Sequence, residues 1–135
     1  MLPEKFDGFS NPWVIGMSSG SWFPLHIEEQ DQPSINYLHV PDRSVPELAD
    51  LPIAKKIWTV VPSNQSQHVE KLMDLLLDGK QHGCPNFIAH KYILLNPHIL
   101  TTFGIDTYYG SQEEGEYTVI YPRAYHTGML KMALK

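Results

Sequence analysis

The sequence predicts a mainly β fold with one inserted helix, and two observations lead to this expectation. Eleven prolines and nine glycines in 135 residues favour many turns and few long helices. Several short segments are rich in β-branched and aromatic residues, and each is bounded by Pro, Gly, Asn or Asp, as strands usually are. These elements suggest a barrel or sandwich that forms one domain or a piece of one.

The expected strands are the apolar segments themselves. They are residues 34–40, 57–61, 91–95 and 117–121. Residues 41–55 lie between the first two of these segments and contain three prolines, which predicts a surface loop.

In one segment, apolar residues recur at the spacing of an α-helix. Residues 66–78 predict a helix, with Ser66 as its N-cap and Gly79 just past its end. Its apolar face is formed by Val69, Leu72, Met73 and Leu76. A shorter helical turn is expected from Pro97 to Gly104.

Charge and composition exclude several classes of protein. The net charge of −5 and the pI near 5.7 argue against a nucleic-acid-binding surface and suit a cationic peptide partner. Neither a signal peptide nor an apolar run long enough for a membrane span is apparent, so we expect a soluble intracellular protein. Cys84 is the single cysteine, so no disulfide can form within the chain.

Two His-x-Glu pairs are the first candidates for chemistry. In a strand, residues i and i+2 point to the same face, so His26 and Glu28 could reach one ion. His68 and Glu70 fall on the expected helix, where this spacing separates side chains, so we interpret them as solvated surface residues.

A third ligand is expected from another strand end, and His126 follows a strand that Pro122 terminates. Two histidines and one carboxylate form the facial triad of non-haem Fe(II) oxygenases. The same ligand set could hold a catalytic zinc ion. The residue types alone leave both metals open.

Four blocks of sequence point to a known family. They read HIEEQDQPSINYLHV, KKIWTVVP, GCPNFIAHKYILLNPHIL and QEEGEYTVIYPRAYHTG, in this order. Together they resemble the Jumonji C (JmjC) histone lysine demethylases over roughly residues 11–129. The third block resembles the subfamily that removes trimethyl marks from histone H3 tails, and PRAYHTG is equally similar to a sister subfamily.

The resemblance implies a set of ligands for metal and cosubstrate. His26, Glu28 and His126 would bind Fe(II). Lys56 would pair with the distal carboxylate of 2-oxoglutarate, and Asn36 would hydrogen-bond this cosubstrate. A buried lysine needs an anionic partner, which a dicarboxylate supplies.

Further roles follow from the same resemblance. Phe23 would pack beside the cosubstrate, Trp58 would line its pocket, and Lys91 would lie on the substrate side. Cys84 and His90 would be half of a structural zinc site, which the family completes with two further cysteines. Because this chain has no other cysteine, we expect a lone thiol at Cys84.

The resemblance also implies a fold and domain boundaries. The expected fold is the JmjC double-stranded β-helix, a jelly-roll of the cupin-like class. The family has a preceding module and a closing strand that this chain does not match, so we expect an incomplete core, truncated at both ends. Residues 1–10 are then an N-terminal tail, 11–129 a partial JmjC domain and 130–135 a divergent C-terminal tail.

Three functions remain open from the sequence. The first is an Fe(II)- and 2-oxoglutarate-dependent dioxygenase that demethylates a methylated histone H3 tail in the nucleus, by N-methyl hydroxylation with release of formaldehyde. The second is a truncated, catalytically inactive JmjC protein that acts as a chromatin- or protein-binding module. The third keeps the oxygenase chemistry but hydroxylates a protein or small molecule. No direct nucleic-acid site and no membrane association are expected.

Overall fold

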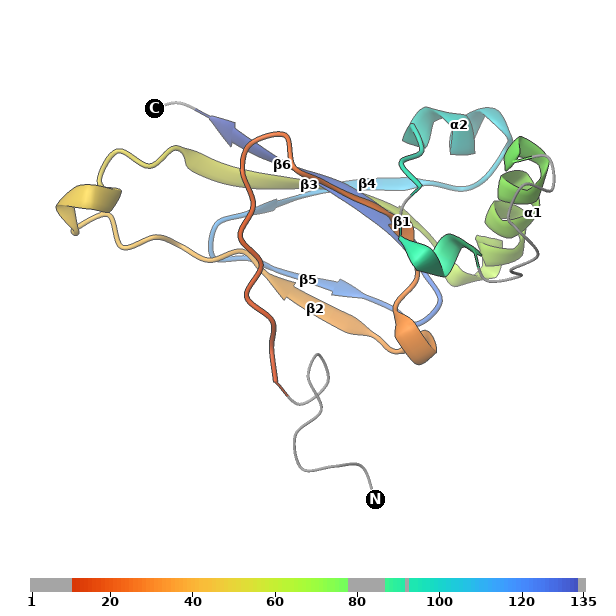
Figure 1. Ribbon diagram of the computed structural model, residues 1–135, viewed down its shortest axis with the longest axis horizontal. Coiled ribbons are helices and arrows are strands. Elements are labelled where there is room, and N and C mark those ends of the chain that lie inside the picture. Colours follow the sequence, from red (N-terminus) through yellow and green to blue (C-terminus); the bar gives the residue numbers. More distant parts are fainter. Residues whose placement is uncertain (1–10, 78–86, 92, 134–135) are drawn as a thin grey trace, which may run out of the picture.

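Two antiparallel sheets face each other across the core, and both α-helices lie at one end of them (Figure 1). The computed structural model describes residues 11–77, 87–91 and 93–133. Its strands are β1 (Trp22–His26), β2 (Ser34–Tyr37), β3 (Ile53–Val61), β4 (Tyr108–Glu113), β5 (Tyr117–Ile120) and β6 (Tyr125–Ala133). Its helices are α1 (Ser66–Leu77) and α2 (Pro97–Thr102), with short 3₁₀ turns at Glu29–Asp31, Pro46–Leu48, Ser63–Gln65 and Phe87–His90.

The larger sheet has the strand order β1-β6-β3-β4, and the smaller one pairs β2 with β5. In the larger sheet β6 lies between β1 and β3, and its pairing with β3 runs from Ile53↔Ala133 to Val61↔Tyr125. This antiparallel jelly-roll arrangement confirms the predicted mainly β fold with one inserted helix. Residues 130–133 of the expected C-terminal tail lie within β6, and the domain boundaries stay a prediction.

Three of the four expected strands exist, and one prediction was wrong. The segments 34–40, 57–61 and 117–121 contain β2, the second half of β3, and β5. Residues 93–95 form no strand, although Leu95 is buried and the Ile93 carbonyl accepts a hydrogen bond from the Leu25 amide. A short apolar run signals burial, which an irregular segment lining the core satisfies as well as a strand does. The expected loop 41–55 gives its last three residues to β3.

The sequence pattern located helix α1 well but not its first turn. Val69, Leu72 and Met73 are buried as predicted, whereas Leu76 is 43% exposed. Ser66 is not an N-cap, because it has helical backbone angles and its hydroxyl donates to the Arg123 carbonyl at 2.6 Å. Gly79, the predicted stop, lies outside the described residues.

The shorter helix α2 matches its prediction. The Asn96 side chain caps it by accepting a hydrogen bond from the His98 amide at 3.0 Å. Gly104 follows with a φ of +73°, which glycine adopts at little cost. None of the helices in the described part of the chain is long and apolar enough to cross a membrane.

The hydrophobic core consists of two clusters. The larger one lies at the end of the sheets where α1 packs, and it includes Leu25, Val61, Val69 and Met73. The smaller one contains Trp58, Ile120 and Ala124, with Phe23 packed against it. Since Trp58 belongs to β3 and Ile120 to β5, this second cluster fills the space between the two sheets and forms the floor of the site described next.

Candidate metal centre

The two halves of the predicted ligand set meet where β1 ends and β6 begins. His26 is the last residue of β1 and lies opposite His126 in the register of the two strands. The backbone remains extended at Glu28, with φ −70° and ψ 152°, so the Glu28 side chain can follow that of His26 toward the same face. The structure therefore brings His126 next to His26 and Glu28, which lie about 100 positions earlier in the sequence.

The distances suit a single metal ion. One ligand atom from each of His26, Glu28 and His126 lies within 4.8 Å of the other two. The His126 Nε2 is 3.4 Å from the Glu28 carboxylate, and the two imidazole centroids are 4.3 Å apart. Because metal–ligand bonds measure roughly 2.0–2.2 Å, ligands at neighbouring positions of one ion lie about 3 Å apart, so side-chain shifts of about an ångström or more would place all three on one ion.

Backbone carbonyls orient both imidazole rings. The His26 Nδ1 lies 2.7 Å from the Pro24 carbonyl, and the His126 Nδ1 lies 3.0 Å from the Ala124 carbonyl. A carbonyl only accepts, so each Nδ1 donates a proton to it, and Nε2 is the ring nitrogen that each histidine presents to the site. Metal-binding histidines are usually held in this way by a partner on the other ring nitrogen.

The protonation states also suit a metal. Burial, aided by the nearby His126, lowers the pKa of His26 to about 4, so this imidazole is neutral at neutral pH. The hydrogen bond with His126 lowers the pKa of Glu28 to about 2, and a hydrogen bond with Ser34 adds to this effect. A neutral imidazole and an ionised carboxylate are the forms that coordinate a metal.

Beside the three ligands lies a buried cation that forms no ion pair within the described part of the chain. Lys56 is 6% exposed, and its Nζ lies 4.1 Å from the Trp58 ring centroid and 4.6 Å from that of Phe23. Burial lowers the pKa of Lys56 to about 8. A buried ammonium group that packs against aromatic rings, with no anion among the described residues, is costly until an anion reaches it.

Phe23 stands between the lysine and the metal ligands. Its ring centroid is 5.2 Å from that of Trp58 and 6.0–6.1 Å from those of His26 and His126. Asn36 lies on β2 in the opposite sheet and is half-buried. Lys56 on β3 and Asn36 on β2 thus belong to different sheets, and their shared role in one site stays a prediction.

The other predicted residues are placed less centrally. Lys91 is half-buried near the ligands, since its charge contributes to lowering the pKa of His26, and its Nζ is 3.7 Å from Glu29. His90 is exposed at the end of a 3₁₀ turn. Cys84 lies outside the described residues, so the half zinc site stays a prediction.

The turn that follows Glu28 is held by ion pairs at both ends. Asp31 pairs with Arg123 at 3.0 Å, just before His126, and Glu29 pairs with Lys91. Among the residues that the structure describes, four other than glycine have a positive φ, between 54° and 61°, and all lie in this region: Gln30, Asp31, Lys91 and Arg123. Such strained conformations tend to cluster at functional sites.

The sequence analysis missed several residues that support the site. Ser34 bonds to Glu28, and the Thr127 hydroxyl donates to the Phe23 carbonyl at 2.6 Å. Gln112 is 1% exposed and accepts a hydrogen bond from the Trp58 indole at 2.9 Å. Ser34 lies in an expected strand, whereas Thr127 and Gln112 gave no signal in the sequence.

Gly128 leaves the space that Phe23 occupies. A Cβ on this residue would lie 2.6 Å from both the Ile57 carbonyl and the Phe23 ring. The Ile57 carbonyl belongs to the ladder between β3 and β6, so it cannot move without disturbing the sheet. Glycine is therefore required here for close approach.

We expect Gly128→Ala to destabilise the protein by about 1–3 kcal/mol, because overpacking of this kind forces side chains and backbone to shift. Gly110→Ala is the matched control. Gly110 and Gly128 both lie opposite Trp58, on its two neighbouring strands, but a Cβ on Gly110 meets nothing within 4 Å. Urea denaturation should find the control within about 0.5 kcal/mol of the wild type. Equal losses for both variants would refute this account of Gly128.

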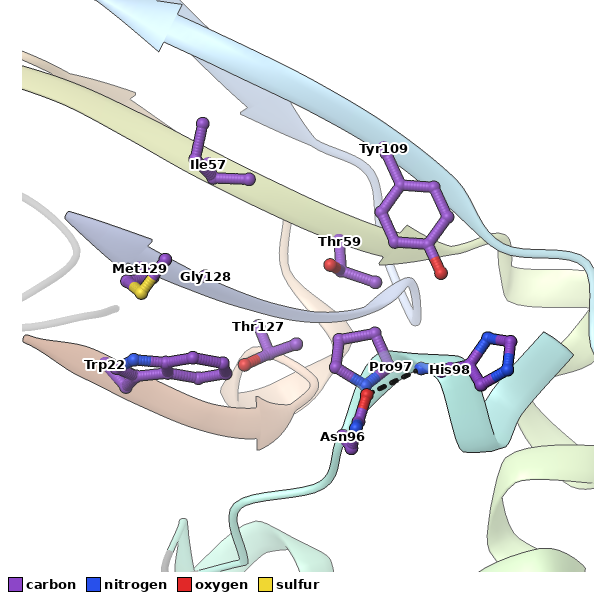
Figure 2. Close-up of a pocket in the computed structure, with 10 residues that line it drawn as sticks. All are labelled: Trp22, Ile57, Thr59, Asn96, Pro97, His98, Tyr109, Thr127, Gly128 and Met129. Carbon is purple, nitrogen blue, oxygen red and sulfur yellow. Dashed lines mark hydrogen bonds between the residues drawn. The ribbon is translucent and has the colours of Figure 1, made fainter. Parts of the chain in front are cut away.

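A groove of about 300 Å³ lies on the other face of the larger sheet (Figure 2). Its lining residues alternate along the strands with those of the site, as with Ile57 and Thr59 on either side of Trp58. Trp22 and Tyr109 line it from β1 and β4, and Pro97 from the start of α2. None of the predicted site residues lines this groove, so it is separate from the candidate metal centre.

Fold and site together define a cupin-like jelly roll that brings together three residues able to hold a metal ion. Residues 13–131 match the family described as JmjC domain, hydroxylase, and the chain belongs to this family. The resemblance predicted from the four sequence blocks is thereby confirmed.

Curated relatives of the chain are lysine demethylases by name. It is 34% identical over 122 residues to probable lysine-specific demethylase 4F of Homo sapiens, covering 90% of this chain and 17% of the relative. Identity to lysine-specific demethylase 4B of Mus musculus is 30% over 122 residues, covering 90% and 10%. Identity to lysine-specific demethylase 5D of Homo sapiens is 31% over 127 residues, covering 94% and 8%. The chain thus spans less than a fifth of the length of these three relatives.

Proposed function

We propose that this chain is the catalytic core of an Fe(II)- and 2-oxoglutarate-dependent dioxygenase that demethylates methyl-lysine in histone H3 tails. The single observation that carries the proposal is the convergence of His26, Glu28 and His126. Two imidazoles and one carboxylate suit Fe(II) and leave other coordination positions open. Membership of the JmjC domain, hydroxylase family supports the same reading.

The chain's own residues bind and orient the reactants. His26, Glu28 and His126 would hold Fe(II), which, when bound, would activate dioxygen together with 2-oxoglutarate. Lys56 would pair with the distal carboxylate of 2-oxoglutarate, and Asn36 would hydrogen-bond to it. This pairing would supply an anion to the buried Lys56, which none of the described residues provides.

The aromatic residues would shape the cosubstrate pocket. Phe23 and Trp58 form an apolar wall around Lys56, which would exclude water and strengthen its interaction with a carboxylate. Lys91 would lie on the substrate side, where its ion pair with Glu29 adjoins the ligand Glu28.

The net reaction accounts for all atoms of dioxygen. One oxygen atom would enter succinate as 2-oxoglutarate loses CO₂, and the other would convert an N-methyl group into an N-hydroxymethyl group. The latter would break down to formaldehyde and an amine with one methyl group fewer. A methylated histone tail is basic, which suits the net charge of −5, and such a substrate implies a nuclear location.

Turnover of a trimethyl-lysine histone H3 peptide tests the proposal directly. With Fe(II), 2-oxoglutarate and air, we expect equal amounts of succinate and formaldehyde, and a peptide that is lighter by one methylene. The same peptide with unmodified lysine is the control. A gain of one oxygen without loss of methyl would favour a hydroxylase instead. Metal binding without any product would favour the inactive, partner-binding alternative.

A further inference from the structure

The side chain of Gln112 connects the two sheets beside the proposed cosubstrate pocket. It lies on β4 and is 1% exposed. Its Oε1 accepts from the Trp58 indole Nε1 at 2.9 Å, and its Nε2 donates to the Asn36 carbonyl at 3.0 Å and to the Glu116 carbonyl at 2.8 Å. Both amide protons and the amide oxygen are therefore used, and the bonds reach residues of both sheets.

These bonds end on the two sides of the pocket. The Trp58 ring that Gln112 holds lies 4.1 Å from the Lys56 Nζ. The carbonyl that it holds in the other sheet is that of Asn36 itself. One buried side chain thus fixes the Trp58 ring, which packs against Lys56, relative to the backbone of Asn36.

The neutrality of Gln112 matters as much as its bonds. Gln112 is the direct cross-strand neighbour of Lys56 in the pairing of β3 with β4. Side chains in this position approach closely, so a carboxylate here would pair with the lysine. A neutral amide satisfies the indole and the two carbonyls while leaving the ammonium group available to a ligand.

We propose that Gln112 is a positioning residue for the cosubstrate, which holds Trp58 and Asn36 in register and keeps Lys56 unpaired. This inference rests on the proposed function. Gln112 touches neither metal nor cosubstrate in this assignment. Its removal should therefore weaken the binding of a dicarboxylate and leave the binding of a metal ion unchanged.

Calorimetric titration of two ligands tests this separation of effects. The probes are Mn²⁺ for the metal centre and N-oxalylglycine, a non-reacting analogue of 2-oxoglutarate, for the pocket. For Gln112→Met, which keeps the size but loses all three hydrogen bonds, we expect the Kd of the analogue to rise at least tenfold. The Kd of Mn²⁺ should stay within twofold of the wild-type value.

Gln112→Glu is the second variant to be titrated with both probes. It also keeps the test possible if Gln112→Met does not fold. It keeps the acceptor for Trp58 and places an anion beside Lys56, so we expect a larger loss of analogue affinity than for Gln112→Met. Ser111→Ala is the control, since this exposed neighbour points to the other face of β4.

The outcomes separate this inference from the function on which it rests. If the wild type binds the analogue but both Gln112 variants bind it equally well, the inference fails while the proposed function stands. Equal losses of analogue and Mn²⁺ affinity would also overturn it, because they would indicate a merely structural role. Absence of analogue binding by the wild type would overturn both.

Discussion

We expect that replacing His26 with alanine will abolish the proposed metal binding and turnover, whereas replacing His68 with alanine will leave both unchanged. Both histidines begin a His-x-Glu pair, so the two variants test the same motif in two settings. His26 ends a strand and faces His126, while His68 is exposed on α1. The structure groups His26 with two further ligand atoms within 4.8 Å.

The expected loss for His26→Ala is large because a direct ligand disappears. Mutations in the supporting shell alone typically cost about 10–100-fold in metal affinity or activity, so removal of a ligand should exceed about 100-fold. Titration with Mn²⁺ measures the affinity, and succinate formation measures turnover. A His26→Ala protein that binds Mn²⁺ as tightly as the wild type would exclude this metal centre. Circular dichroism confirms that both variants remain folded.

Replacing Lys56 with methionine should weaken cosubstrate binding and at the same time stabilise the free protein. The proposed pocket offers one cation to the distal carboxylate, and removal of one partner from a buried charge pair costs about 2–5 kcal/mol. The Kd of N-oxalylglycine should therefore rise at least about 30-fold. Without a ligand, the same substitution removes a buried ammonium group that forms no ion pair with any described residue, and replaces it with an apolar chain of similar length.

The gain in stability for Lys56→Met depends on pH in a defined direction. The pKa of Lys56 falls from 10.5 to about 8 in the folded protein, because burial disfavours its charged form. Below pH 8 both states carry the proton, so the wild type bears the whole penalty, about 1–3 kcal/mol after discounting the aromatic contacts. Between pH 8 and 10.5 the folded state releases its proton before the unfolded state does, and wild-type stability rises.

Urea denaturation near pH 7 and near pH 10 measures this dependence, and Lys55→Met is the control. Lys55 is the partly exposed neighbour of Lys56 and pairs with Glu113 at 3.0 Å on the surface, where ion pairs contribute little. The advantage of Lys56→Met over the wild type should shrink as pH rises, while Lys55→Met shows no such trend. A Lys56→Met protein that is less stable than the wild type at pH 7 would contradict the conclusion that Lys56 is a buried cation without an ion-pair partner among the described residues.

Local sequence patterns predicted correctly those features that depend on a single helix or strand. The period of α1 identified Val69, Leu72 and Met73 as buried, and the alternation of a strand placed His26 and Glu28 on one face. Strand β4 was missed because its sequence, YYGSQE, is polar and contains a glycine, and only one of its residues is buried. An edge strand of this kind carries no apolar alternation for a pattern to detect.

Features that depend on contacts between distant segments could not be predicted from local sequence patterns. Gln112 bonds to residues 54 and 76 positions away, and nothing in its neighbourhood distinguishes it from a surface glutamine. Gly128 gives no local signal either, because the ring that it accommodates comes from Phe23. The Ser66 hydroxyl would have capped its own helix, but the Arg123 carbonyl offers it a buried partner instead.

The place of β6 in the sheet determines when the metal centre can form during folding. β6 lies between β1 and β3 although it follows both in the chain by many residues, so β1 cannot join the sheet before β6 has been inserted. Pairings over such long separations require costly loop closure and form slowly. A chain emerging from the ribosome would thus carry His26 and Glu28 without affinity for a metal until β6 is in place. Metal uptake would then report the completion of the sheet.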